Sequence, residues 1–313
     1  MVSTVRIGTR ASPLAKVQAY QMQAAITHAL GAPPEDADIV APLVFITTTG
    51  DRIQDRRLLE IGGKALFTKE IEAALAMGEI DCAVHSLKDV PAERHDGLAL
   101  AAFPLREDPR DAFISTRFET FEALPHGARL GSASLRRAAQ ALHRRPDLQI
   151  VMLRGNVQTR LAKLEAGECD ATLLALAGLN RLGLAQHARQ IFDPVSMPPA
   201  PGQGALAIET RAEDSGAAWA VALRHPQTGV AVAAERGALE ALEGSCRTAI
   251  GAHARAKGAD MVLTVEALTP DGAERWRREG QVSLAEGEAG ARALGLAFGQ
   301  AIRAEAGDKL QLG

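Results

Sequence analysis

Short apolar segments typical of strands alternate with longer segments typical of helices through the first two-thirds of the sequence. The strand-like segments lie at or within residues 5–8, 38–49, 81–85, 98–103, 129–131, 149–153, 171–175 and 205–209. The helix-like segments cover residues 12–30, 68–77, 135–144, 157–165 and 176–182. The first of these opens with Ser12 as an N-cap and Pro13 in the first turn. This alternation predicts an α/β fold with helices packed on both faces of each sheet.

Two loop-like runs, at residues 104–109 and 194–201, interrupt the alternation. We expect the chain to cross from one lobe to another at each run, which gives two doubly wound lobes with a hinged cleft between them. The expected division is domain 1 over residues 1–104 and 201–223, domain 2 over residues 105–200, and domain 3 over residues 224–313.

The last of these domains has a different pattern. A helix is expected over residues 230–242, with Gly244 as the glycine that ends it. Residues 262–268 and 274–282 alternate like antiparallel strands around a Pro-Asp-Gly turn, and an Ala-rich helix covers residues 284–303. We therefore expect a small α+β C-terminal domain.

Charge and composition exclude several classes of protein. The 35 basic and 38 acidic residues give a net charge of −3, and 4% of the residues are aromatic. Both values disfavour a nucleic-acid binder, which needs a basic surface or stacking platforms. The three cysteines form neither a disulfide framework nor a CxxC motif. No signal peptide or membrane helix is recognisable, so we expect a cytoplasmic protein with no membrane partner.

Arginines recur where a strand gives way to a helix. Arg10 follows the first strand, Arg136 and Arg137 open one later helix, and Arg154 and Arg160 flank the start of another. Ligands of α/β proteins lie beyond the carboxyl ends of the strands, where helix N-termini offer free N–H groups. Any one of these arginines is more often an ordinary surface residue. As a series of cations that oppose helix dipoles, they predict a small polyanion as the ligand.

Two other segments carry reactive side chains. Residues 85–91 end a buried strand in Lys88 and Asp89, which either face a ligand or form a turn in which Asp89 caps local N–H groups. Cys246 follows the end of a helix, where it is either an accessible thiol or a small buried hydrophobe. The residues alone leave both alternatives open.

Common cofactor and metal motifs are absent or out of context. Residues 62–65 lack the spacing of a Walker A loop, and the GxGxxA run at residues 202–207 follows a Pro-rich segment instead of a strand. The eight histidines show no metal-ligand spacing, so no metal site is expected.

Eight blocks resemble, in order, the porphobilinogen deaminase family, whose members are also called hydroxymethylbilane synthases. The blocks are RIGTRASPLA (6–15), GGKALFTKE (62–70), AVHSLKDVP (83–91), REDPRDAF (106–113), GSASLRR (131–137), LRGNVQTRL (153–161), PGQG (201–204) and LEGSC (242–246). The resemblance implies two lobes like periplasmic-binding-protein (type II) domains. It also implies a transferase of porphyrin and haem biosynthesis, which joins four porphobilinogen molecules head to tail into hydroxymethylbilane and releases ammonia.

The resemblance also assigns the reactive residues. Cys246 matches the residue that holds a dipyrromethane cofactor through a thioether, and Asp89 matches the catalytic carboxylate. A carboxylate suits this chemistry because loss of ammonia leaves a cation delocalised onto the pyrrole nitrogen. The same carboxylate could also carry the proton that is lost on coupling.

The pyrrole acetates and propionates explain the arginines, since the growing chain is a polyanion. The matching cofactor- and substrate-binding positions are Arg10, Ser12, Lys64, Ser86, Lys88, Ser132, Ser134, Arg136, Arg137, Arg154, Arg160, Arg181 and Gln203. Residues 50–63 match a mobile loop over the site. The resemblance further implies a monomer that passes on free hydroxymethylbilane.

Few positions depart from the family pattern. Glu60 stands where members often carry a lysine, so that cofactor contact is not transferred, and Ser245 replaces a common glycine. The alternative function is a non-catalytic, two-lobed protein that binds small anions, which the lobes and arginines fit equally well. The absence of a signal peptide, together with Asp89 and Cys246, disfavours it.

Overall fold

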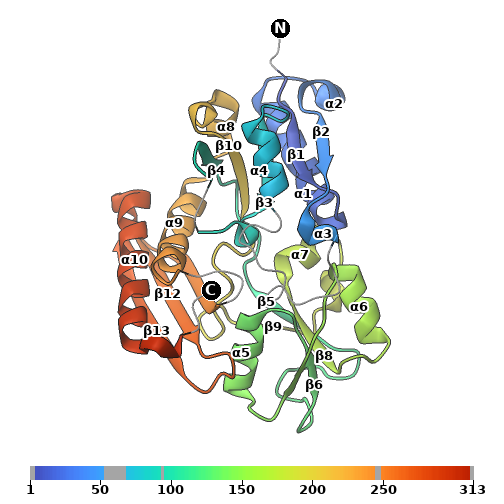
Figure 1. Cartoon of the computed structure of the whole chain (residues 1–313), viewed down its shortest axis with the longest axis vertical. Helices are drawn as coiled ribbons and strands as arrows, with labels where there is room; N and C mark the ends of the chain where they lie inside the picture. The colour runs from blue at the N-terminus through green and yellow to red at the C-terminus, as the bar shows by residue number, and fades with distance from the viewer. Residues whose placement is uncertain (1–3, 53–67, 93–94, 244–247, 311–313) are drawn as a thin grey trace. The chain divides into compact units, whose positions relative to one another are not determined.

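The computed structural model describes residues 4–52, 68–92, 95–243 and 248–310. The chain divides into two compact units (Figure 1). Unit 1 comprises Met1–Asp55, Gly63–Glu107 and Ala205–Gly229, and unit 2 comprises Arg56–Gly62, Asp108–Gly204 and Val230–Gly313.

Unit 1 is built on a five-stranded sheet in the order β2-β1-β3-β10-β4. β1 runs parallel to β2 and β3, whereas β10 runs antiparallel to β3 and β4. Its strands are β1 (Ile7–Arg10), β2 (Leu43–Ile46), β3 (Cys82–Ser86), β4 (Leu98–Ala102) and β10 (Leu206–Arg211). Its helices are α1 (Pro13–Ala29), α2 (Ala37–Val40), α3 (Thr49–Arg52), α4 (Lys69–Ala76) and α8 (Ala218–Ala222).

Helices cover both faces of this sheet. Met22 and Ile26 of α1 pack on Val84 of β3, whereas Ile71 and Leu75 of α4 pack with Ala83, the preceding strand residue. Because successive strand residues point to opposite faces, α1 and α4 must lie on opposite sides of β3. A strand covered on both faces has little polar alternation, which is why β3 reads as a continuous apolar run up to His85.

Unit 2 contains a second five-stranded sheet, in the order β7-β6-β8-β5-β9. β6 runs parallel to β7 and β8, and β5 runs antiparallel to β8 and β9. The strands are β5 (Asp111–Ile114), β6 (Arg129–Gly131), β7 (Gln149–Val151), β8 (Ala171–Ala175) and β9 (Gln190–Ile191). The helices are α5 (Leu135–Arg144), α6 (Val157–Glu165) and α7 (Leu176–Arg181).

Unit 2 also contains the C-terminal sheet, an antiparallel meander of β11 (Ala249–Lys257), β12 (Asp260–Leu268) and β13 (Arg275–Ser283). Helices α9 (Pro226–Ala241) and α10 (Gly287–Ala306) pack together against this sheet (Figure 1). Their close approach depends on glycine, since Gly295 and Gly299 of α10 face backbone atoms of α9.

The predicted fold class is confirmed: the chain is α/β, with two sheet-based lobes and a small α+β C-terminal domain. Each strand and helix predicted from the alternation has a counterpart, with ends that shift by a few residues. Of the expected loop at residues 50–63, residues 50–52 belong to α3 and the rest lies outside the described residues.

Three strands of the structure were not predicted from the sequence pattern. β5 begins with the charged Asp111 directly after a loop-like run, β9 has only two residues, and β11 is rich in Ala with no β-branched residue beyond Ile250. The end of α9 also differs from expectation. The last helical residue is Ala241, and Glu243 adopts the left-handed conformation, with φ of 47°. Gly244, which was expected to end the helix, lies outside the described residues.

The contact between α9 and α10 yields a first prediction. A Cβ on Gly295 would stand 2.0 Å from the Ala234 carbonyl oxygen. Alanine raises helix propensity by about 1 kcal/mol, but overpacking costs about 1–3 kcal/mol or more. Gly295→Ala should therefore lower the free energy of unfolding measured in urea.

Gly216→Ala is the control, because an added Cβ there meets no described atom within 4 Å. An equal effect of the two substitutions, or a more stable Gly295→Ala variant, would contradict the packing of α10 on α9.

Candidate functional site

Side chains at strand-to-helix junctions cap the helices that follow. Ser12 caps α1, and its Oγ accepts the Ala15 N–H at 3.3 Å, which confirms the predicted N-cap. Ser134 caps α5 and Asn156 caps α6 in the same way. Each cap satisfies one of the N–H groups at the start of the helix and leaves others available to an anion.

The turn between β6 and α5 contains both predicted serines. The Ser132 hydroxyl accepts the Ser134 N–H at 3.1 Å and lies 3.2 Å from the Ser134 carbonyl oxygen. Ser132 is buried, and Ser134 is half-buried. Both hydroxyls therefore hold the backbone of the turn in the described structure.

In unit 1, the sequence-predicted residues lie where β1 and β3 end. Arg10 is the last residue of β1, and Ser86 is the last residue of β3. A 3-10 turn, Leu87–Asp89, follows, with Lys88 and Asp89 half-buried. The Asp89 carboxylate makes no hydrogen bond to any described residue, so the alternative in which it caps local N–H groups gains no support.

Arg136 and Arg137 share one buried carboxylate in unit 2. Arg136 Nη1 donates to Asp111 Oδ2 at 2.7 Å, and Arg137 Nη2 donates to Asp111 Oδ1 at 2.8 Å. All three side chains are at least nine-tenths buried. Burial alone would raise the pKa of Asp111, but the two guanidinium charges outweigh it and hold that pKa well below its usual range.

Amides extend this network. Gln203 is fully buried, and its Nε2 donates to Asp111 Oδ1 at 2.9 Å and to the Pro109 carbonyl oxygen at 2.7 Å. Gln140 accepts from Arg136 Nη1 at 2.8 Å and donates to Glu266 Oε1, which belongs to the C-terminal sheet, at 3.0 Å. Arg136, Arg137 and Gln203 are thus brought together around Asp111.

Sequence reasoning missed Asp111, Gln140 and Glu266. Asp111 lies in the REDPRDAF block, and an aspartate beside the apolar Ala-Phe-Ile run was the signal that could have singled it out. A buried acid opening a strand implies a basic partner nearby. The other two residues carry no comparable local signal, because their burial depends on contact between distant segments.

The remaining predicted arginines of unit 2 are half-buried. Arg160 Nε donates to the Gly155 carbonyl oxygen at 2.8 Å, and Arg181 Nη2 donates to that of Gly204 at 2.9 Å. Arg154 differs from both: its Nη1 is buried and has no hydrogen-bond partner among the described residues.

Among the predicted site arginines, two buried guanidinium nitrogens therefore lack an acceptor within the described ranges, Arg154 Nη1 and Arg136 Nε. Arg255 Nη1, in the C-terminal sheet, is a third such nitrogen outside the predicted site. A buried cationic donor without an acceptor is costly, and a carboxylate oxygen is its natural partner. The donor set of unit 2 fits a ligand that carries several carboxylates.

Five residues named in the sequence analysis fall outside the described residues: Glu60, Lys64, Gly244, Ser245 and Cys246. The two other cysteines are described. Cys82 and Cys169 are buried and free, and burial raises the pKa of both thiols.

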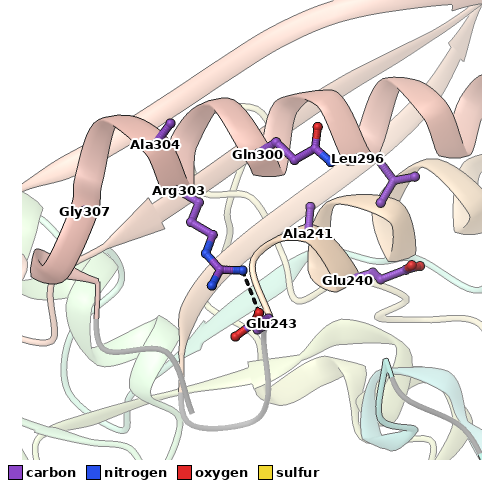
Figure 2. A pocket seen from close by; sticks show the side chains of 8 residues that line it. All are labelled: Glu240, Ala241, Glu243, Leu296, Gln300, Arg303, Ala304 and Gly307. Atoms are coloured by element: carbon purple, nitrogen blue, oxygen red, sulfur yellow. Dashed lines mark hydrogen bonds and ion pairs between the residues drawn. The ribbon is translucent and has the colours of Figure 1, made fainter.

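An open groove of about 680 Å³ runs between the C-terminal ends of α9 and α10 (Figure 2). It is lined by Glu240, Ala241, Glu243, Leu296, Gln300, Arg303, Ala304 and Gly307. Arg303 Nη1 donates to Glu243 at 2.7 Å across it. Among the described residues, none of the predicted site residues lines this groove.

The described residues contain neither a metal-binding cluster nor a membrane-spanning helix. No group of three or more His, Cys, Asp or Glu side chains there could hold a metal ion. No helix in the same ranges is long and apolar enough to cross a membrane.

The fold and the donor set define a class: an α/β protein that binds a small ligand with several carboxylates. Residues 5–218 match the family described as "Porphobilinogen deaminase, dipyromethane cofactor binding domain", and residues 230–304 match "Porphobilinogen deaminase, C-terminal domain". The chain belongs to the porphobilinogen deaminase family.

Two porphobilinogen deaminases support the same assignment over 98% of the chain. The porphobilinogen deaminase of Caulobacter vibrioides is 65% identical over 314 residues, with 98% of each chain covered. That of Phenylobacterium zucineum is 62% identical with the same coverage. Among solved structures, a nutrient-binding protein from Burkholderia cenocepacia, bound to methionine, is 16% identical over 70% of this chain and 90% of that chain, with a TM-score of 0.42.

The function follows from family membership. The protein is a transferase of tetrapyrrole biosynthesis that polymerises porphobilinogen into hydroxymethylbilane, with dipyrromethane as its cofactor. The alternative of a non-catalytic anion binder is therefore wrong.

The buried carboxylate yields a second prediction. Asp111→Asn leaves two buried guanidinium groups without a counter-charge, which should cost about 3–5 kcal/mol of unfolding free energy at pH 7. Because the folded pKa of Asp111 lies below the unfolded value of about 3.9, its contribution is complete above that pH. The contribution is lost as the pH falls through the folded pKa.

Urea unfolding of both proteins from pH 7 down to pH 3 tests this prediction, with Glu119→Gln as the control. Glu119 is an exposed carboxylate of the same unit that pairs with Arg189 at 3.3 Å. The account would be contradicted if Asp111→Asn lowered the free energy of unfolding as little as the control does. It would also be contradicted if the difference in unfolding free energy between wild type and Asp111→Asn grew as the pH falls.

Proposed function

We propose that Cys246 anchors the dipyrromethane cofactor through a thioether and that Asp89 is the catalytic carboxylate. The observation that carries the binding part of this proposal is the pair of buried donors, Arg136 Nε and Arg154 Nη1, without an acceptor among the described residues. Pyrrole acetates and propionates supply carboxylate oxygens that suit such donors.

The state of the other two cysteines supports Cys246 as the anchor. A thioether forms from a thiolate, and burial disfavours the thiolate at Cys82 and Cys169. Of the three cysteines in the sequence, Cys246 is the one that lies in the LEGSC block and matches the attachment position of the family. When bound, dipyrromethane supplies the pyrrole carbon to which the first substrate unit is joined.

The polar residues at the strand ends bind the carboxylates in this proposal. In unit 1 these are Arg10, Ser12, Lys64, Ser86 and Lys88. In unit 2 they are Ser132, Ser134, Arg136, Arg137, Arg154, Arg160, Arg181 and Gln203. Asp111 pairs with both Arg136 and Arg137, and the buried Glu266 lies near Arg136 through Gln140. The Arg136 Nε still has no acceptor among the described residues and is free to bind a ligand carboxylate.

Asp89 acts on the substrate in this mechanism. The substrate amine is largely ammonium at neutral pH. Its C–N bond breaks, the departing ammonia takes the electron pair, and the positive charge passes to the carbon and spreads onto the pyrrole nitrogen. A carboxylate that makes no hydrogen bond to any described residue keeps its lone pairs for this pyrrole N–H. After the new C–C bond forms, the same carboxylate accepts the proton lost from the coupled carbon.

Several further properties belong to this proposal. We expect a cytoplasmic monomer that releases free hydroxymethylbilane, built from domain 1 (residues 1–104 and 201–223), domain 2 (105–200) and domain 3 (224–313). The chain length and the separate match of residues 230–304 to a C-terminal domain support this division.

The anchor is tested by intact mass. Purified protein should exceed its sequence mass by one dipyrromethane, and Cys246→Ser should remove that excess. Cys169→Ala, which changes a buried thiol, should keep it. Active wild-type protein without the added mass would refute the anchor.

The role of Asp89 is tested by turnover. Asp89→Asn should keep the fold and the added mass but lower kcat about 10²–10³-fold, the usual cost of losing one charge-stabilising group. Asp96→Asn, an exposed neighbour in the same unit, is the control and should leave kcat unchanged. Near-normal turnover of Asp89→Asn would remove its assigned role.

A further inference from the structure

The last two residues of β3 point to opposite faces of the unit 1 sheet. Ala83 packs with α4 and Val84 packs with α1, so by alternation His85 lies on the α4 side and Ser86 on the α1 side. Each of the two makes a specific side-chain contact on its own face. Asp89, the proposed catalytic carboxylate, is only three residues further along.

On the α4 side, His85 pairs with Glu209 of β10. The His85 Nε2 lies 3.0 Å from Glu209 Oε2, and the two side chains are 4% and 1% exposed. The Glu209 oxygen accepts this hydrogen bond in the His85 tautomer that carries its proton on Nε2. The backbone register pairs His85 with Ala207, so Glu209 reaches it diagonally across the two strands.

On the α1 side, Ser86 pairs with Gln18. The Gln18 Nε2 donates to Ser86 Oγ at 2.9 Å, and Ser86 Oγ lies 3.1 Å from Gln18 Oε1. Gln18 is a buried residue of α1, the helix that Ser12 caps. Both the nitrogen and the oxygen of this buried amide contact the same hydroxyl, so the amide fixes the position of the Ser86 Oγ.

The turn that follows is fixed at both ends of its backbone. The Leu87 N–H donates to the Ala205 carbonyl oxygen at 3.0 Å, and the Val90 N–H donates to that of Leu87 at 3.0 Å. Leu87 and Val90 are both buried. Asp89 lies between them and makes no side-chain hydrogen bond to a described residue, so its carboxylate takes its position from the backbone.

We infer that the His85–Glu209 and Gln18–Ser86 pairs form a two-sided clamp that positions Asp89 for catalysis. The clamp holds the strand end from which the turn starts, one pair on each face of the sheet. His85, Glu209 and Gln18 are positioning residues and make no contact with the reacting atoms. The inference rests on the proposed role of Asp89.

A purely structural role for these pairs predicts a different outcome. Removing a buried hydrogen bond lowers stability wherever it lies. A positioning role adds a loss of kcat at constant KM, because a displacement of about 1 Å at a reacting group costs up to about 10²-fold in rate.

The experiment compares variants of the cofactor-loaded protein, with kcat expressed per molecule that carries the added mass. Glu209→Leu should lower kcat about 10–100-fold with KM within about 3-fold. Glu209→Gln, whose amide oxygen still accepts from His85 Nε2, should restore kcat to within about 3-fold of wild type. Thr210→Val removes the neighbouring Thr210 hydroxyl bond to the Arg211 carbonyl oxygen and should leave kcat unchanged.

Gln18→Met tests the clamp independently and decides the matter if Glu209→Leu does not fold. Methionine keeps the side-chain length but removes both contacts to Ser86. We expect kcat to fall by a larger factor than KM changes. Normal kcat in a folded Glu209→Leu or Gln18→Met protein would overturn the inference. So would an equal loss of kcat in Thr210→Val.

The result is distinguishable from failure of the proposed function. If Asp89→Asn turns over normally, Asp89 itself is wrongly assigned. If Asp89→Asn is inactive while the clamp variants are normal, only the clamp is wrong.

Discussion

Unit 2 depends on one carboxylate, Asp111, buried between the guanidinium groups of Arg136 and Arg137. Two cations in the first turn of a helix oppose the helix dipole and would repel each other when buried. Asp111 offsets both effects, Gln203 donates a further hydrogen bond to Asp111, and Gln140 accepts one from Arg136. The strand ends and the C-terminal sheet are joined through this network, since Gln140 reaches Glu266.

The same network explains how a slightly acidic protein binds a polyanion. The net charge of −3 is a sum over the whole chain, whereas Arg136 and Arg137 place two guanidinium groups in the interior beside Asp111 and, through Gln140, Glu266. Inside the protein the effective dielectric is lower than in water, so a buried guanidinium donor attracts a carboxylate more strongly than an exposed lysine would. Arg154 and Arg136 still lack an acceptor for one nitrogen each among the described residues, which makes carboxylate binding part of the energetics of this unit.

Much of the fold could be predicted from local patterns. Ser12 and Pro13 mark the start of α1, and the apolar run before Ser86 marks β3, because caps and periodicity are local. The strand at Asp111 could not be predicted this way, since an aspartate becomes acceptable in a buried strand only when Arg136 and Arg137 reach it from another segment. The positions of the arginines predicted an anionic ligand. The sequence could not show that Arg136 is held by Asp111, or that one nitrogen of Arg154 lacks a partner among the described residues, because both facts depend on side chains from distant segments.

The central claim is that pyrrole carboxylates satisfy the buried guanidinium donors of unit 2. The most direct test is a crystal structure of the purified protein with its cofactor in place. The account predicts a carboxylate oxygen of the cofactor within about 3 Å of Arg154 Nη1, the ordinary length of such a bond. A structure in which Arg154 pairs with a carboxylate of the protein, while the cofactor carboxylates bind elsewhere, would contradict it.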